Sequence, residues 1–319
     1  MAVCGMVGKT VTGYSMSTKA LWKYAKLATP ILIGAALLWF LLSLVDLRAV
    51  RESLLNVSVA KLVPFIIVLY SVHLVATYRW QCGLAFVGVH IPYRDLLRFF
   101  LANLPITKLL PLYSGDFVRS LYIKEHASLT RGSGIVLFES LLDVVVLLLL
   151  VFVGSLFSNR WEFAAVSVSV LAGAFTALFI VDRVRIPHRY LRPVYELIDT
   201  LGTLYRRPAF VLKIAGLTLL MWLGTLSFTY GAFLALGVSV TWSTVIMLQP
   251  LATLIALLPV SVGGAGTREA AMLVLYAGMI DAAAVVSAGL LYTLLAIIVL
   301  PLLCVPLSIH EMRKLTNKI

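Results

Sequence analysis

Charged residues and cysteine are both scarce in this sequence. Only 13% of the 319 residues are charged and the mean hydropathy is +1.01, which is too apolar for an ordinary soluble domain. The three cysteines, Cys4, Cys82 and Cys304, lie far apart, so neither a disulfide framework nor a zinc site is expected. This composition predicts an all-α polytopic membrane protein.

Several chemical signatures are missing as well. The run 263–266 (GGAG) lacks the Lys-Ser/Thr pair and the flanking strand of a nucleotide-binding loop. No spacing suggests a metal site, a cofactor site or a nucleophile with its base. The first 20 residues lack the compact apolar core and cleavage site of a signal peptide. We therefore expect no cofactor, no metal and no cleaved leader.

Basic residues outnumber acidic ones, with 26 Lys and Arg against 14 Asp and Glu. They cluster between the apolar stretches, where orientation in an anionic membrane explains them better than nucleic-acid binding. Six stretches are long enough to cross a bilayer, namely 25–45, 62–81, 135–157, 163–181, 214–236 and 282–309. Tyr78, Arg79 and Trp80 are interpreted as an interfacial anchor, 48–61 as a loop, and the middle of 182–213 as a surface helix.

Two further apolar runs are broken, at 109–120 (LLPLYSGDFVRS) and at 257–270 (LLPVSVGGAGTREA). A helix broken inside hydrocarbon leaves backbone groups unpaired, so such breaks persist only where they are buried in protein or line a watery cavity. We expect two re-entrant helical hairpins, 94–131 and 243–279. Eight spans, with two short crossings in place of each hairpin, are the alternative.

The distribution of Lys and Arg agrees with this topology. With the N-terminus in the cytoplasm, 21 of these residues fall on the cytoplasmic side and 5 on the other. Both termini are then cytoplasmic, and the hairpins enter from opposite faces. The alternative with eight spans keeps every loop on the same side.

The two halves of the chain resemble each other. Residues 88–93 align with 237–242 at an offset of 149, and 109–111 align with 257–259 at 148. We interpret 1–157 and 158–319 as two membrane repeats, each with three crossings and one hairpin. An odd number of crossings inverts the second repeat, as in secondary transporters that open alternately to each side.

The breaks carry the candidate binding residues, which are Gly115, Asp116 and Arg119 in the first and Gly263, Gly264, Gly266, Thr267, Arg268 and Glu269 in the second. The glycines permit positive φ angles, and Thr267 and Asp116 are expected to cap their helices. Helix N-termini and arginine forks suit an anion, so Arg119 and Arg268 are predicted to bind a lipid phosphate. Glu269 is expected to hold Arg268. A purely structural salt bridge is the alternative.

Glu139 and Asp143 lie four residues apart on one face of the third crossing. They could bind protons coupled to transport, or they could pair with Arg119 and Arg268, which we favour. His73 could relay protons, although a hydrogen bond to a neighbouring helix is the more common use of such a residue.

Pro111, Gly115, Asp116 and Arg119, then Glu139 and Asp143, then Pro259-x3-Gly-Gly-x-Gly-x-Arg-Glu resemble the flippase-like transmembrane family, which includes the membrane domain of lysylphosphatidylglycerol synthases. The resemblance covers nearly the whole chain. It implies movement of a phospholipid or polyprenyl-linked lipid between leaflets. Ser140 departs from the pattern, because relatives often carry Arg there. The resemblance is to the membrane domain alone, so we expect no soluble synthase domain, and aminoacylation is not implied.

The leading hypothesis is a flippase of a prokaryotic cytoplasmic membrane that moves an anionic phospholipid or polyprenyl-phosphate-linked lipid by alternating access. Lipid-biosynthetic enzymes are possible partners. An intramembrane phosphatase or glycosyltransferase acting on a polyprenyl phosphate is the alternative, with Glu139, Asp143 and Asp116 as its only acid–base candidates. A supporting subunit of a biosynthetic complex is the third possibility.

Overall fold

The computed structural model describes residues 45–110, 114–183, 207–258 and 261–316, with a few more between 32 and 43. Helices dominate these residues, and no strand occurs among them. Four helical stretches in the described part of the chain are long and apolar enough to cross a membrane: Val59–Phe86, Arg131–Phe157, Pro208–Ala235 and Ala282–Leu315. The predicted all-α membrane protein is confirmed at this level.

Five of the six expected crossings coincide with observed helices. These are α3 (Val59–Phe86), α6 (Leu129–Phe157), α7 (Trp161–Arg183), α9 (Pro208–Ala235) and the continuous α12 (Ala282–Tyr292), η2 (Thr293–Val299) and α13 (Leu300–Thr316). The segment η2 is a π-helical stretch between the two α-helices. Most of the expected first crossing, 25–45, and the expected surface helix within 182–213 lie outside the described residues.

The expected loop at 48–61 is wrong, because α2 (Leu47–Leu55) forms there. The Asp46 side chain caps α2 by accepting a hydrogen bond of 2.8 Å from the Arg48 N–H. Val50 is buried against Ala283 and Val286 of α12. The packing of Val50 thus holds α2 against α12, although the charged residues of this segment suggested a loop.

Both predicted hairpins are pairs of short helices. The first consists of α4 (Tyr93–Leu109) and α5 (Ser114–Tyr122), and the second of α10 (Trp242–Ala256), the 3₁₀ turn η1 (Val262–Gly264) and α11 (Thr267–Leu275). The expected extension of the first hairpin helix to residue 131 is wrong. The Ser128 hydroxyl accepts a bond of 3.4 Å from the Arg131 N–H and starts α6 there instead. Pro111 and Pro259 lie outside the described residues.

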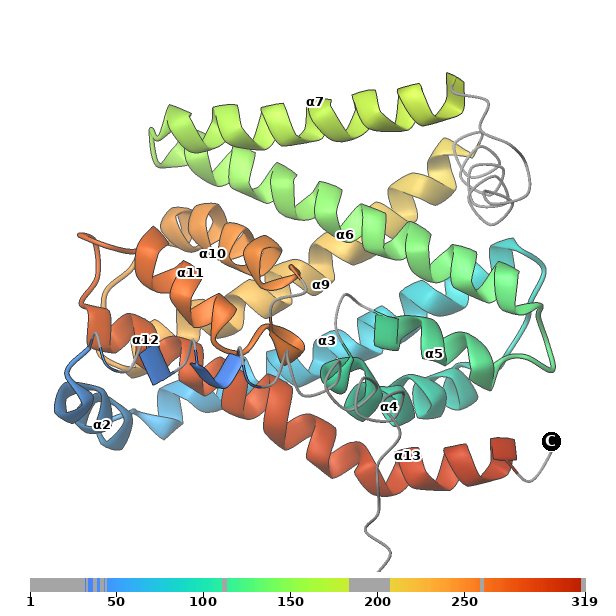
Figure 1. The fold of residues 1–319 in the computed structure, drawn as a ribbon, viewed down its shortest axis with the longest axis horizontal. Helices are drawn as coiled ribbons and strands as arrows, with labels where there is room; N and C mark the ends of the chain where they lie inside the picture. The colour runs from blue at the N-terminus through green and yellow to red at the C-terminus, as the bar shows by residue number, and fades with distance from the viewer. Residues whose placement is uncertain are drawn as a thin grey trace, which may run out of the picture.

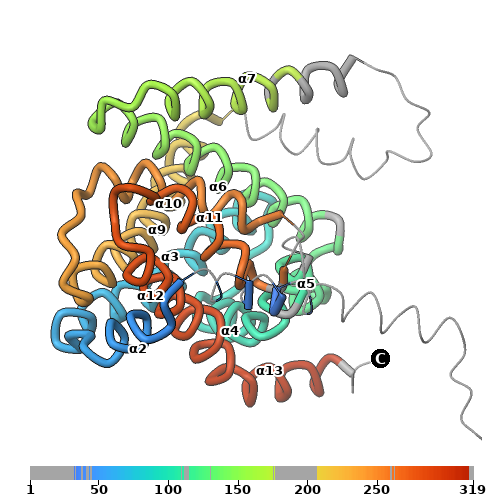
Figure 2. The backbone as a smooth tube through the Cα atoms, turned by 60° about the vertical axis from the view of Figure 1, so that its left-hand side comes forward, coloured from blue at the N-terminus to red at the C-terminus, as the bar shows by residue number. Residues whose placement is uncertain are grey.

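The long helices form the centre of the molecule. Figure 1 shows α3 and α9 side by side, with α4 and α5 near one end of the pair and α10 and α11 near the other. The contacts cross between the halves, since α10 packs against α6 and α13 packs against α4. Helix α7 lies along α6 and stands apart from the remaining helices in Figure 2.

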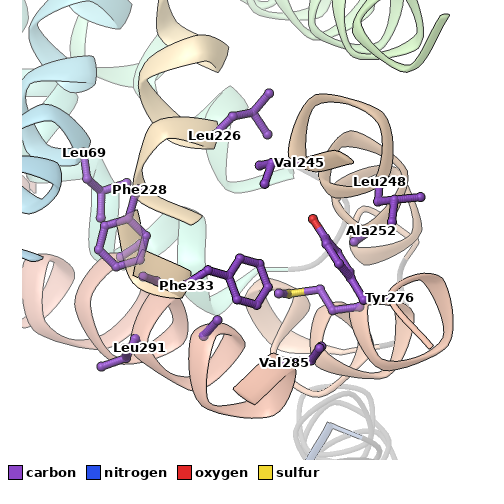
Figure 3. Packing of buried hydrophobic residues seen from close by; sticks show 14 of the residues in the cluster. Leu69, Leu226, Phe228, Phe233, Val245, Leu248, Ala252, Tyr276, Val285 and Leu291 are labelled. Carbon is purple, nitrogen blue, oxygen red and sulfur yellow. The ribbon is translucent and has the colours of Figure 1, made fainter. Parts of the chain in front are cut away.

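The largest core cluster joins α9, α10, α11 and α12 to α3 and α6. Figure 3 shows Phe233 beside Tyr276, and Phe228 farther away beside Leu69, and all four side chains are buried. Helix packing in lipid depends on close van der Waals fit, because lipid tails are as apolar as the core. Gly154 of α6 illustrates the fit, since a Cβ atom there would come within 2.6 Å of the Met247 backbone nitrogen.

Candidate anion site between the two hairpins

A cavity of about 220 Å³ lies between the hairpins, and α3, α6, α9 and α12 complete its wall. Its charged lining residues are Arg79, Lys108, Asp116, Arg119, Asp143 and Arg268. The two predicted arginines, one from each hairpin, therefore face a single cavity. Of the predicted glycines, Gly263 and Gly264 line it as well.

The tip of the second hairpin is built by glycines with left-handed backbone angles. Gly263, Gly264 and Gly266 have φ values of 61°, 78° and 85°, which are strained for a residue with a side chain. Gly264 also sits close to α10, because a Cβ atom there would lie 2.9 Å from Ala256 Cβ. The prediction that glycines shape this break agrees with these angles.

The cap of α11 differs from the prediction. Gly266, and not Thr267, is the N-cap, and its N–H donates a 2.6 Å bond to Glu269 Oε2. The Thr267 hydroxyl lies 2.8 Å from the Ser261 hydroxyl and donates a bond to the Gly264 carbonyl at 3.1 Å. Thr267 therefore ties the turn together instead of capping the helix.

Glu269 does not hold Arg268 as predicted. Its second oxygen, Oε1, accepts a 2.6 Å bond from the Thr293 hydroxyl of η2. Both carboxylate oxygens of this fully buried residue are thus used for the turn and for the neighbouring helix. No ion pair joins Glu269 to Arg268 in the described part of the structure.

Arg268 is only 8% exposed, yet no carboxylate among the described residues pairs with it. Its guanidinium carbon lies 4.3 Å from the centre of the Tyr292 ring, a cation–π contact. The Nη1 atom is buried and has no hydrogen-bond partner within the described ranges. A buried charge left in this condition is costly, and an anion in the cavity would relieve the cost.

The first hairpin closes by direct backbone contact. A Cβ atom at Gly115 would lie 2.4 Å from Thr107 Cα, so only glycine fits between α4 and α5. The Asn103 amide donates bonds of 2.9 Å to the Gly115 carbonyl and to the Thr107 hydroxyl. That hydroxyl lies 3.3 Å from Asp116 Oδ1. Asp116 therefore contacts Thr107 and does not cap α5 as expected. Its negative charge still lies in the first turn of α5, where the helix dipole favours it.

Arg119 and Arg79 belong to a buried cluster with two carboxylates of α6. Arg119 Nη2 pairs with Glu139 Oε2. Arg79 binds Asp143 through two bonds of 2.6 and 3.3 Å, and its Nε lies 3.7 Å from Glu139 Oε1. Trp222 Nε1 donates a further 3.0 Å bond to Asp143. The favoured interpretation of both acids as arginine partners agrees with the structure, but the partner of Asp143 is Arg79 and not Arg268.

Sequence reasoning missed Arg79 and Lys108. The sequence pattern predicts an interfacial anchor at Arg79, but this residue is 5% exposed and Trp80 is fully buried. Helix α3 continues through Gly83 to Phe86, which places Arg79 two turns inside the helix. Lys108 lies in the last turn of α4, directly before the break. His73 lines the cavity too, and its Nδ1 is 3.2 Å from the Tyr70 carbonyl of its own helix.

The family model for the lysylphosphatidylglycerol synthase transmembrane region matches residues 27–304. The chain belongs to this family. The predicted resemblance is thereby confirmed, and the protein is a multi-pass membrane protein related to lipid synthesis or flipping. A search of the curated proteins gives no match.

The geometry gives this member of the lysylphosphatidylglycerol synthase transmembrane family two distinct charged regions. One contains Arg79, Arg119, Glu139 and Asp143, whose charges are paired with one another. The other contains Arg268, whose charge is unpaired among the described residues. Within those residues no group of three His, Cys, Asp or Glu side chains is placed to hold a metal. The arrangement is suited to binding an anion.

Proposed function

We propose that this protein is a lipid flippase that binds an anionic headgroup in the cavity between the hairpins while the lipid tails remain in the bilayer. The observation that carries the proposal is the buried, unpaired guanidinium of Arg268 in a cavity that both hairpins line. Intramembrane charges are expensive and usually mark a substrate pathway. The substrate is an anionic phospholipid or a polyprenyl-phosphate-linked lipid.

Alternating access between two inverted repeats, 1–157 and 158–319, is the mechanism we propose. Helices α3 and α9 are both 28 residues long, and α5 and α11 are both 9. Gly88 after α3 and Gly237 after α9 share positive φ angles of 82° and 78°. These matches support six crossings plus two re-entrant hairpins, an arrangement in which one repeat can rock against the other around a fixed site.

We place the protein in a prokaryotic cytoplasmic membrane with both termini in the cytoplasm. The excess of Lys and Arg on one side supports this orientation. Arg79, Arg119 and Arg268 are buried and are not loop charges. If they are left out of the count, Lys and Arg are still in excess on the cytoplasmic side. Lipid-biosynthetic enzymes remain proposed partners.

Transport accounts for the site better than catalysis. An intramembrane enzyme would need a carboxylate free to move a proton. Glu139 and Asp143 are bound to arginines instead. The third candidate, Asp116, has no ion pair in the described structure, and its Oδ1 lies 3.3 Å from the Thr107 hydroxyl. We therefore propose that the protein moves its lipid unchanged.

The test is leaflet exchange in vesicles that contain the purified full-length chain. Fluorescent phosphatidylglycerol is placed in both leaflets, and the outer pool is bleached by a reductant that does not cross the membrane. We expect bleaching to proceed beyond half of the signal with the wild type and to stop near half with Arg268→Ala. Arg51→Ala, at an exposed position on α2, is the control. A modified lipid product on chromatography, or no exchange by the wild type, would contradict the proposal.

A further inference from the structure

We infer that the phosphate of the transported lipid binds between Arg268 of the second hairpin and Lys108 of the first, and that Arg119 is not its ligand. This inference rests on the proposed function and names the residues that recognise the substrate. It changes the view taken from the sequence, in which Arg119 and Arg268 were equivalent phosphate ligands.

Lys108 lies where the two hairpins meet. Helix α4 contacts η1, and the Lys108 carbonyl lies 3.4 Å from the position that a Cβ atom would take at Gly263. The Lys108 side chain lines the cavity that Arg268 also lines, and no carboxylate in the described structure pairs with it. Two cations, one from each hairpin tip, are therefore available to a ligand in this cavity.

Arg268 supplies the more directional half of the site. Its buried Nη1 has no partner among the described residues, and the Tyr292 ring packs on its guanidinium. An arginine fork can bind two phosphate oxygens together, whereas a lysine ammonium acts as a point charge. In this inference a single phosphate group binds both residues and thereby connects the two hairpins.

The charge of Arg119 is already paired with a carboxylate. Glu139 pairs with Nη2, and the guanidinium carbon lies 5.2 Å from the centre of the Trp80 ring. Arg119 Nε has no hydrogen-bond partner among the described residues, but Glu139 lies against the same guanidinium, and its negative charge would repel a phosphate bound there. Arg119 is thus a positioning residue that holds α5 against α6.

Calorimetric binding to the full-length protein in detergent tests this assignment. The probes are a short-chain phosphatidylglycerol below its critical micelle concentration and inorganic phosphate. The variants are Lys108→Gln and Arg268→Gln, with Lys61→Gln and Arg51→Gln as controls, because both control positions are exposed and neither lines the cavity. The double variant Arg119→Gln/Glu139→Gln removes both partners of the Arg119–Glu139 ion pair, so neither charge is left buried without its partner.

We expect Lys108→Gln and Arg268→Gln each to weaken lipid binding by about tenfold or more, because each removes one charged hydrogen bond. The two controls and the Arg119→Gln/Glu139→Gln protein should bind within about threefold of the wild type, a change of under about 1 kcal/mol. Wild-type affinity in Lys108→Gln, or loss of binding in the protein without the Arg119 pair, would overturn the inference.

Two results separate this inference from the proposed function. If Lys108 and Arg268 are both needed for binding but wild-type vesicles exchange no lipid, the site stands and the flippase proposal fails. If inorganic phosphate binds as tightly as the lipid and with the same dependence on both residues, the ligand is free phosphate and the assignment to a lipid is overturned.

Discussion

Arg119 and Arg268 occupy corresponding places in the two hairpins, 149 residues apart, but different side chains face them. Glu139 is the eleventh residue of α6 and pairs with Arg119, while Tyr292 is the eleventh residue of α12 and packs on Arg268. The charge of Arg119 is paired with a carboxylate, whereas the charge of Arg268 has no carboxylate partner in the described structure.

In the repeat that we propose, the same backbone geometry serves two different tasks. In both halves a glycine allows the two hairpin helices to touch, Gly115 against Thr107 and Gly264 against Ala256, and these pairs are also 149 residues apart. The residue opposite the arginine decides whether it joins helices or remains free for a ligand. We therefore propose that the arginine of the first hairpin stabilises the fold and that the arginine of the second binds the ligand.

The largest expected effect is on stability, where the two arginines should differ. Arg119→Gln leaves Glu139 buried, with only Arg79 Nε at 3.7 Å as a neighbouring cation, and should destabilise the protein by about 3–5 kcal/mol. Arg268→Gln removes a costly buried charge together with its contact to the Tyr292 ring, so the two effects oppose each other and stability should change by less than about 1 kcal/mol. Thermal unfolding in detergent, followed by circular dichroism, measures both. Equal losses would contradict the proposed division of tasks.

The two hairpin glycines should be needed for different reasons. Gly115→Ala forces the Thr107 backbone to move, whereas Gly264→Ala places a side chain at a φ of +78° and 2.9 Å from Ala256 Cβ. Each should cost about 1–3 kcal/mol, with Gly115→Ala the more damaging. Gly216→Ala in α9 is the control, because a Cβ atom there meets nothing within 4 Å. Unfolding midpoints that match this control would contradict the close contact in both hairpins.

Much of this fold could be predicted from local sequence. Five crossings follow from apolar stretches of sufficient length, and both breaks follow from Pro, Gly and Arg inside such stretches. The joint location of Arg119 and Arg268 at one cavity follows from the offset between the halves. Each of these features depends on residues near one another in the chain or on a simple repeat.

The partners of the charges could not be predicted in the same way. Arg79 and Asp143 are 64 residues apart, and their 2.6 Å bond depends on how α3 and α6 pack. Glu269 stands next to Arg268 in sequence, but adjacent residues on a helix point in different directions, so it reaches Gly266 and Thr293 instead. The apolar pattern of a helix does not show which residues of a neighbouring helix will lie opposite its charged side chains.

Giving the second half the acid of the first should inhibit transport. Tyr292→Glu places a carboxylate beside Arg268, as Glu139 lies beside Arg119, and should reduce leaflet exchange about tenfold, equivalent to about 1.4 kcal/mol. Tyr292→Phe keeps the ring and should exchange lipid at close to the wild-type rate. The vesicle assay measures both variants. Normal exchange by Tyr292→Glu would show that Arg268 need not be free.

The smallest expected effect on stability and binding comes from replacing Thr107 of the first hairpin by alanine, the residue at the corresponding position of the second. Thr107 corresponds to Ala256, and its hydroxyl accepts the Asn103 amide and lies near Asp116. Thr107→Ala should lower stability by about 1 kcal/mol, because the Asn103 amide keeps its 2.9 Å bond to the Gly115 carbonyl. Binding of short-chain phosphatidylglycerol should stay within about twofold, a change of less than about 0.5 kcal/mol. A much larger loss of binding would mean that the hydroxyl or Asp116 touches the lipid, and the first hairpin would then share in recognition beyond Lys108.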